Sequence, residues 1–279
     1  MLILKFTTFI GIVVLLDSIQ ATDITKSLLR GENSFCSPFL TWKRPEHVVP
    51  FPHEWHTFTA KSIHNPKEEV EYIIKDIPED RYDEVVDLMA LYILKYEPLY
   101  VALKFWNDSE VIKHFKAEWR RQLKQKLSVA CFRNDGSDEI IGISILTVVE
   151  KADIISKTIA TYINDKLDEF ISLIRDLYSF DTFQKYGVKE YLTSDGFGID
   201  PKYKNTGIDV ELVKISEKIC RTFGIKLTSS IFISDPMNKI ADKLRFKPNN
   251  DRSYRDMRQI FGIIPPVVTG ICLKTLVIS

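Results

Sequence analysis

The sequence lacks an excess of charge of either sign, because its 279 residues carry 38 Lys and Arg against 38 Asp and Glu. A protein that binds nucleic acid mainly through phosphate contacts needs a basic excess, so we predict no nucleic-acid partner. No internal run reaches 18 apolar residues, which excludes a polytopic membrane protein. With only 11 glycines and 12 prolines, the chain is neither collagen-like nor of low complexity.

Cysteine is also scarce, and the four residues form no CxxC pair. That spacing disfavours a zinc ribbon or a thioredoxin-type redox site. Isolated buried thiols are the simpler interpretation, and the even count leaves disulfides open as the alternative. The four are Cys36, Cys131, Cys220 and Cys272. Hydrophobic residues make up 45% of the chain and charged residues 27%, so the chain can bury a sizeable core.

The first 21 residues, MLILKFTTFIGIVVLLDSIQA, read as a secretory signal peptide. A single charge, Lys5, precedes an apolar run over 6–16, and a polar stretch ending in Ala21 follows. Ile19 stands where a small residue is usual before the cleavage site, so the alternatives are an N-terminal anchor or an extra start on a cytosolic protein. We predict secretion or the secretory pathway, with the cytoplasm as the alternative, and no membrane contact beyond this segment.

Residues 22–69 read as an irregular arm lying on the following domain, because five prolines alternate with aromatic residues there. Four of the five histidines also fall in this arm. A metal site through His53 and His56 is conceivable, but no cysteine or acidic cluster completes it at the usual spacing. We therefore predict no metal.

The remainder, 70–279, alternates strand and helix patterns and predicts one α/β domain with a mixed sheet. Strands are predicted over 71–77, 127–132, 140–149, 190–199, 225–234, 252–257 and 271–278. Amphipathic helices are predicted from about 80 to 96, 109 to 123, 207 to 223 and 236 to 244, with a helical insertion over about 152–180. Gly196 and Gly198 interrupt one strand and indicate a bulge or a close backbone approach.

The stretch IDPKYKNTGIDVEL, residues 199–212, is typical of an anion cradle. A strand ends, a turn follows, and Gly207 begins an amphipathic helix whose free N–H groups and positive dipole end favour an anion. Lys202 and Lys204 stand beside it. Taken alone the pattern is weak, because many α/β turns share it.

The same stretch resembles motif A of the GNAT acetyltransferases, which Pro201, Tyr203 and Gly207 match. Two further segments are similar to insect arylalkylamine N-acetyltransferase-like proteins: LYILKYEPLYVAL at 91–103 and the closing helix MNKIADKLRF at 237–246. The resemblance implies a GNAT-like mixed, mostly antiparallel central sheet flanked by helices.

The resemblance also implies an activity, the acetyl-CoA-dependent N-acetylation of a small alkylamine or arylalkylamine by direct transfer. Glu97 takes the position of the carboxylate base, and a backbone N–H near Gly198 would polarise the thioester carbonyl. The residues implied for the cofactor are Gly198, Ile199, Lys204, Asn205, Thr206, Gly207 and Ile208. The aromatic residues Tyr92, Tyr96, Tyr100 and Phe105 either wall an amine pocket or pack in the core.

The chain departs from the family pattern at several positions. Asp209 replaces the final small residue of motif A and would repel a diphosphate if it faced the cofactor; turned outward, it would stabilise its own helix. Arg245 replaces a glycine of the closing helix. Ser234 is the nearest match to the family's catalytic serines, although the alignment of this segment with the family is not fixed. Tyr254 is a weaker candidate for the residue that protonates the CoA thiolate. The alternative function is a catalytically decayed, secreted GNAT-fold binding protein.

Overall fold

The computed structural model describes residues 40–65, 67–151, 153, 165–253, 255–256, 258 and 270–279. The predicted signal segment 1–21, Cys36, Tyr254 and much of the predicted insertion over 152–180 lie outside these residues.

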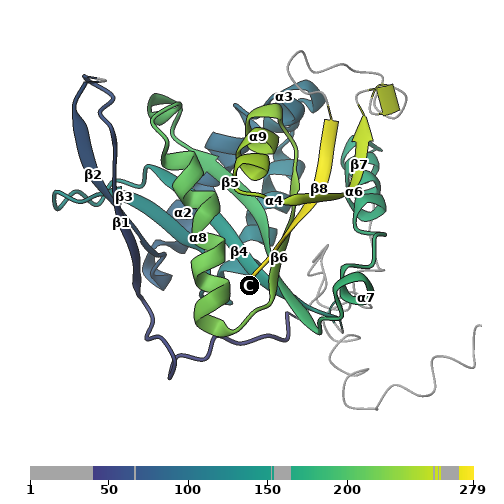
Figure 1. Ribbon diagram of the computed structural model, residues 1–279. Helices are drawn as coiled ribbons and strands as arrows, with labels where there is room; N and C mark the ends of the chain where they lie inside the picture. The colour runs from purple at the N-terminus through teal and green to yellow at the C-terminus, as the bar shows by residue number, and fades with distance from the viewer. Residues whose placement is uncertain are drawn as a thin grey trace, which may run out of the picture. The chain divides into compact units, whose positions relative to one another are not determined.

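A single sheet of eight strands, in the order β1-β2-β3-β4-β5-β6-β8-β7, organises the described part of the chain (Figure 1). The strands are β1 (Glu54–Lys61), β2 (Glu69–Asp76), β3 (Val129–Arg133), β4 (Gly142–Glu150), β5 (Glu190–Ile199), β6 (Leu227–Phe232), β7 (Lys247–Ser253) and β8 (Gly270–Val277). Every neighbouring pair is antiparallel except β5 and β6, which run parallel. The predicted mixed, mostly antiparallel sheet is confirmed.

Helices cover both faces of this sheet (Figure 1). They are η2 (Glu79–Arg81), α2 (Tyr82–Met89), η3 (Ala90–Leu94), α3 (Pro98–Leu103), η4 (Phe105–Asn107), α4 (Ser109–Leu123), α6 (Asp165–Leu177), α7 (Thr182–Tyr186), η5 (Pro201–Tyr203), α8 (Ile208–Phe223) and α9 (Asp235–Lys243).

Alternating strand residues decide which helices each face carries. In β2, Ile73 joins the cluster that buries α2, α3, α4 and α6, whereas its neighbour Ile74 joins the cluster that buries α8. We call these faces the α4 face and the α8 face. A third cluster joins α8 to α9 through Val213 and Ile240.

The ends of several elements follow from single residues, as the sequence predicts. Asp108 caps α4, because its carboxylate accepts the amides of Glu110 and Val111 at 3.0 and 3.1 Å. Gly207 and Gly224 bound α8, and both have positive φ, 97° and 72°. That backbone conformation is the one that glycine adopts without steric cost.

Two strands depart from prediction. The segment 22–69 is not irregular throughout, because Glu54–Lys61 pairs along its length with β2. Its prolines and aromatic residues masked an alternating pattern in which Trp55 is buried. The predicted strand at 252–257 lies earlier, as β7 (Lys247–Ser253), a polar edge strand with no buried residue and so no apolar alternation.

A buried ion pair fixes residues 40–53 to the sheet. Arg44 and Asp76 meet at 2.7 Å, with side chains 1% and 0% exposed. Asp76 also accepts the Trp55 indole N–H at 2.6 Å and the His53 amide at 2.8 Å. The Arg44 guanidinium further donates to the carbonyl oxygens of Lys126 and Pro50. Each charge therefore has partners, which a buried ion pair needs if it is to persist.

Candidate functional site

Strands β5 and β6 pair at one end and then separate. The only registered pair is Leu192 with Thr228, and further along the Ser194 amide donates to the Ser230 hydroxyl at 2.9 Å. From Gly196 to Ile199, β5 has no strand neighbour on its β6 side among the described residues. This part of β5 therefore presents backbone groups to the opening.

Amide direction alternates along β5 and decides which N–H groups face that opening. Asp200 donates to the carbonyl oxygen of Ile141, beside β4, at 2.9 Å. By alternation the Gly198 amide also faces β4, whereas the amides of Phe197 and Ile199 face the opening. Gly198 instead lies close under η3, because an added Cβ would stand 3.0 Å from Tyr92 Cβ.

The start of α8 lies directly after β5 and the short η5 turn. The amides of Gly207, Ile208 and Asp209 have no hydrogen-bond acceptor within the described ranges, as expected for the first turn of a helix. A Cβ on Gly207 would meet nothing within 4 Å, so the space beside this cradle is open. Asn205 also has positive φ, 65°.

The Asp209 carboxylate folds back onto its own helix, where its Oδ1 accepts the amide of Val210 at 2.9 Å. The neighbouring Glu211 carboxylate pairs with His56 of β1 at 3.3 Å and with Lys214. These contacts draw both acidic side chains toward their own helix and toward β1. Asp209 thus keeps its negative charge at the first turn of α8, whereas Glu211 is directed toward β1.

Glu97 lies at the junction of three elements. It precedes Pro98 at the start of α3, and its carboxyl lies beside the Ser234 hydroxyl at the start of α9 and near Lys204 of the β5–α8 loop. Burial raises the Glu97 pKa to about 7, while the Lys204 charge and the Ser234 hydroxyl act in the opposite direction. Its Oε1 is buried and has no hydrogen-bond partner in the described part of the chain.

The structure thus brings together Glu97, Lys204 and Ser234, which lie far apart in sequence. Ser234 is 3% exposed and follows the last residue pair of β6 and β8. The sequence shows that Ser234 follows a strand and precedes a helix. It does not show that Ser234 lies near Glu97, because that depends on how β5 and β6 diverge.

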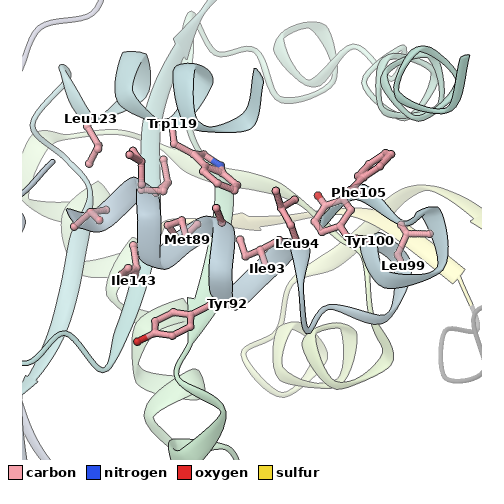
Figure 2. Close-up of a cluster of buried hydrophobic side chains, with 14 of the residues drawn as sticks. Met89, Tyr92, Ile93, Leu94, Leu99, Tyr100, Phe105, Trp119, Leu123 and Ile143 are labelled. Carbon is pink, nitrogen blue, oxygen red and sulfur yellow. The ribbon is translucent and has the colours of Figure 1, made fainter. Parts of the chain in front are cut away.

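The four candidate aromatic residues divide between two roles. Tyr92 and Tyr96 line a recess of about 490 Å³ between α2, η3, the β3–β4 hairpin and the turn over 200–202. Tyr100 and Phe105 pack in the core of the α4 face, with ring centroids 5.7 Å apart. Figure 2 shows these two side by side beyond Leu94.

A bulge in β5 was predicted from its glycines, and it lies at Asp195. The register against β4 shifts between Gly196 opposite Ile145 and Ser194 opposite Leu146, so Asp195 is the extra residue. Nothing in the sequence singled out Asp195, because a bulge site depends on pairing with the neighbouring strand.

The remaining predicted features are simpler to place. Cys131, Cys220 and Cys272 are buried, unpaired thiols whose pKa values burial raises. Within the described ranges, no cluster of three or more His, Cys, Asp or Glu residues could hold a metal ion. None of the helices among those residues has the length and apolarity needed to cross a bilayer.

Comparison with solved structures gives strong matches. A protein of the yellow fever mosquito Aedes aegypti, named arylalkylamine N-acetyltransferase 7, shares 28% sequence identity at a TM-score of 0.79, over 86% of this chain and 100% of its own. The chain has the GNAT acetyltransferase fold. Aedes aegypti arylalkylamine N-acetyltransferase 2 matches at 16% identity over 75% of this chain and 99% of its own, with a TM-score of 0.64.

A polyamine N-acetyltransferase of Drosophila melanogaster matches this GNAT fold at 14% identity, over 74% of this chain and 100% of its own, with a TM-score of 0.62. No family model and no curated protein matches the chain.

Proposed function

We propose that this GNAT-fold protein is an acetyl-CoA-dependent N-acetyltransferase that acts on a small amine. The observation that carries the proposal is the Glu97 carboxyl, half-buried, with a pKa near neutrality and one oxygen unpartnered, at the junction of α3, α9 and the β5–α8 loop. A structural carboxylate would have partners for both oxygens. One that lacks a partner is available to a ligand.

The residues around the opening fit acetyl-CoA. The open space beside Gly207 and the free amides of the first turn of α8 suit a diphosphate, and Lys204 adds a positive charge. The cofactor would supply an activated acetyl group as a thioester. The Phe197 amide faces the opening and is the donor placed to polarise a carbonyl there, in the role assigned above to the Gly198 region.

Glu97 is suited to act as the base. An alkylamine is mostly an ammonium ion at neutral pH and must lose a proton before it attacks a carbonyl carbon. A carboxyl with a pKa of about 7 is half-ionised at neutrality and can accept that proton, directly or through water. The Ser234 hydroxyl lies beside the carboxyl and favours its ionised form.

The names of the matched proteins support an amine acceptor, because they include arylalkylamine and polyamine N-acetyltransferases. The alternative function, a decayed binding protein, rests on Asp209. The Asp209 carboxylate accepts the Val210 amide in the first turn of α8, beside the amides assigned to the diphosphate, so CoA binding decides between the two functions.

A thermal-shift titration with CoA, followed by a turnover assay, tests the proposal. Saturating CoA stabilises any native state that binds it, by about 2.7 kcal/mol at 100 times Kd. We expect the wild type and the Asp209→Gly variant both to shift. A shift in the variant alone would favour the decayed-site alternative, and binding without acetylation of any amine would refute the enzyme.

A further inference from the structure

We propose that Asn107 carries an N-linked oligosaccharide and that this sugar covers an exposed aromatic patch beside it. The inference lies outside the proposed acetyltransferase reaction and does not depend on it. It combines the predicted signal segment over 1–21 with an acceptor sequence, Asn107-Asp108-Ser109, that the structure places on the surface.

The acceptor sequence is the first observation. The enzymes that glycosylate asparagine in the secretory pathway recognise Asn-x-Ser or Asn-x-Thr, where x is any residue except proline. In the full sequence this pattern occurs only at 107–109, because no other asparagine has serine or threonine two positions later. A chain that enters the secretory pathway, as its first 21 residues predict, therefore presents one acceptor.

The Asn107 side chain is available for this bond. Asn107 lies in η4 and Ser109 begins α4, and both are exposed. The Asn107 backbone amide donates to the Lys104 carbonyl oxygen at 3.0 Å, whereas its side chain makes no hydrogen bond within the described ranges. Side-chain amides that do donate to other groups of the protein are those of Asn65, Asn134, Asn238, Asn249 and Asn250.

The fold around the acceptor does not need the Asn107 or Ser109 side chains. Asp108 alone caps α4, since its carboxylate accepts the amides of Glu110 and Val111. A large substituent on the Asn107 amide would therefore extend into solvent from a turn that stays fixed.

An exposed aromatic patch adjoins the acceptor. Trp106 is 37% exposed and Tyr96 is 41% exposed, and the Lys95 ammonium lies 5.6 Å from the centroid of each ring, so the two rings belong to one patch. Exposed apolar patches mark surfaces that something covers. The C–H faces of a pyranose ring are apolar and pack against aromatic rings, so the first sugar on Asn107 would cover the neighbouring Trp106.

The bond forms by transfer of the oligosaccharide from a lipid pyrophosphate donor, which the membrane of the secretory compartment supplies. The Asn107 amide nitrogen forms a bond to C1 of the first sugar, and the bond between C1 and the pyrophosphate oxygen breaks. The lipid pyrophosphate leaves with that electron pair, and the amide proton passes to a base of the transferring enzyme. Modification therefore requires that the chain enter this compartment.

The described cysteines are compatible with such a compartment, which is oxidising. A thiol is oxidised through its thiolate, and burial raises the pKa of the unpaired thiols of Cys131, Cys220 and Cys272. These three side chains remain protonated and shielded, so export does not require them to form disulfides.

The test is to express the full chain in cultured insect cells and to measure the mass of the protein before and after a glycosidase that cleaves between asparagine and the first sugar. We expect a protein heavier than its polypeptide, and loss of the added mass on treatment. Asn107→Gln and Ser109→Ala should abolish the added mass, whereas Ser109→Thr should retain it because threonine also supplies the hydroxyl. Asn134→Gln, at an exposed asparagine outside the pattern, is the matched control and should retain it.

Unmodified protein in the medium would overturn the inference, and so would unmodified protein in the cytosol with Met1 intact. Added mass that persists in Asn107→Gln would place the sugar elsewhere and would also overturn it. Acrylamide quenching of tryptophan fluorescence tests the covered patch. Removing the sugar should increase quenching in the wild type but not in Trp106→Phe, and an equal increase in both would refute contact with Trp106.

Discussion

Asp76 and Glu97 are both carboxylates drawn into the interior of the molecule, and they differ in their partners. Asp76 has its charge matched by Arg44 and both oxygens hydrogen-bonded, to the guanidinium, the Trp55 indole and the His53 amide. Glu97 has a hydroxyl and a nearby ammonium group, but its Oε1 is buried without a partner.

The difference separates a structural acid from a working one. A buried charge whose hydrogen bonds are complete stabilises one conformation and is unavailable to anything else. A buried oxygen without a partner has a free-energy cost that a ligand or a proton can remove. Of the four predictions below, ordered from the largest expected effect to the smallest, three test this distinction and the last tests the anion cradle at α8.

Arg44→Leu should be the most damaging change. It leaves Asp76 buried without its counter-charge, and breaking a buried pair in this way costs about 3–5 kcal/mol. Urea unfolding measures the loss in the free energy of unfolding. Arg120→Ala, which removes an exposed pair with Asp83, is the control and should cost about 0–1 kcal/mol. Similar losses for the two variants would remove the structural role given to Asp76.

Glu97→Gln should leave the fold intact and lower kcat/KM for amine acetylation by about a hundredfold or more at neutral pH. In the wild type, kcat/KM should fall as the pH drops below about 7, because Glu97 becomes protonated. Initial rates measured across pH 5.5–9 test both statements. An unchanged rate in the variant would remove Glu97 from the mechanism, and Glu110→Gln at an exposed position serves as the control.

The same variant makes a prediction about stability. The pKa of Glu97 is raised from 4.5 unfolded to about 7 folded, so the native state binds more protons than the unfolded state between these values. The wild type therefore loses stability as the pH rises from 4.5 to 7. Glu97→Gln lacks this loss and should be more stable than the wild type by about 1–3 kcal/mol above pH 7.

Denaturant unfolding at pH 4.5 and pH 8 measures that difference. We expect it to be small at the lower pH and complete at the higher one. If the wild type is instead the more stable at pH 8, the ionised carboxylate is stabilised in the fold, and the comparison with Asp76 collapses.

Gly207→Ala and Gly224→Ala form a matched pair at the two ends of α8. Both glycines have positive φ, and at neither would a Cβ meet an atom within 4 Å. Each substitution should therefore cost about 1 kcal/mol of stability through backbone strain. Only Gly207→Ala should also weaken CoA binding, measured by calorimetry. An equal loss of CoA affinity in both variants would argue against the cradle.

The sequence allowed much of the fold to be predicted, because buried strands such as β3 and β4 are apolar runs and helices such as α4 and α8 carry an apolar stripe. Strand β7 has too few apolar residues to give a strand pattern in the sequence. Strand β1 was missed because prolines lie close to it in the sequence. Glu97 and Gly207 could be named from a family resemblance. The closeness of Ser234 to Glu97 and the bulge at Asp195 could not, because both arise from pairing between strands that are distant in sequence.

The wide turn η3 (Ala90–Leu94) has a consequence for how the site could be moved. A π-type turn holds one more residue than an α-helical turn, and it is followed by Glu97, whose amide donates to the Ile93 carbonyl. Deleting one residue there would restore ordinary winding and rotate all that follows by about 100°. The extra residue of η3 therefore sets the rotation of Glu97 about the helix axis relative to α2, whose apolar side faces the sheet.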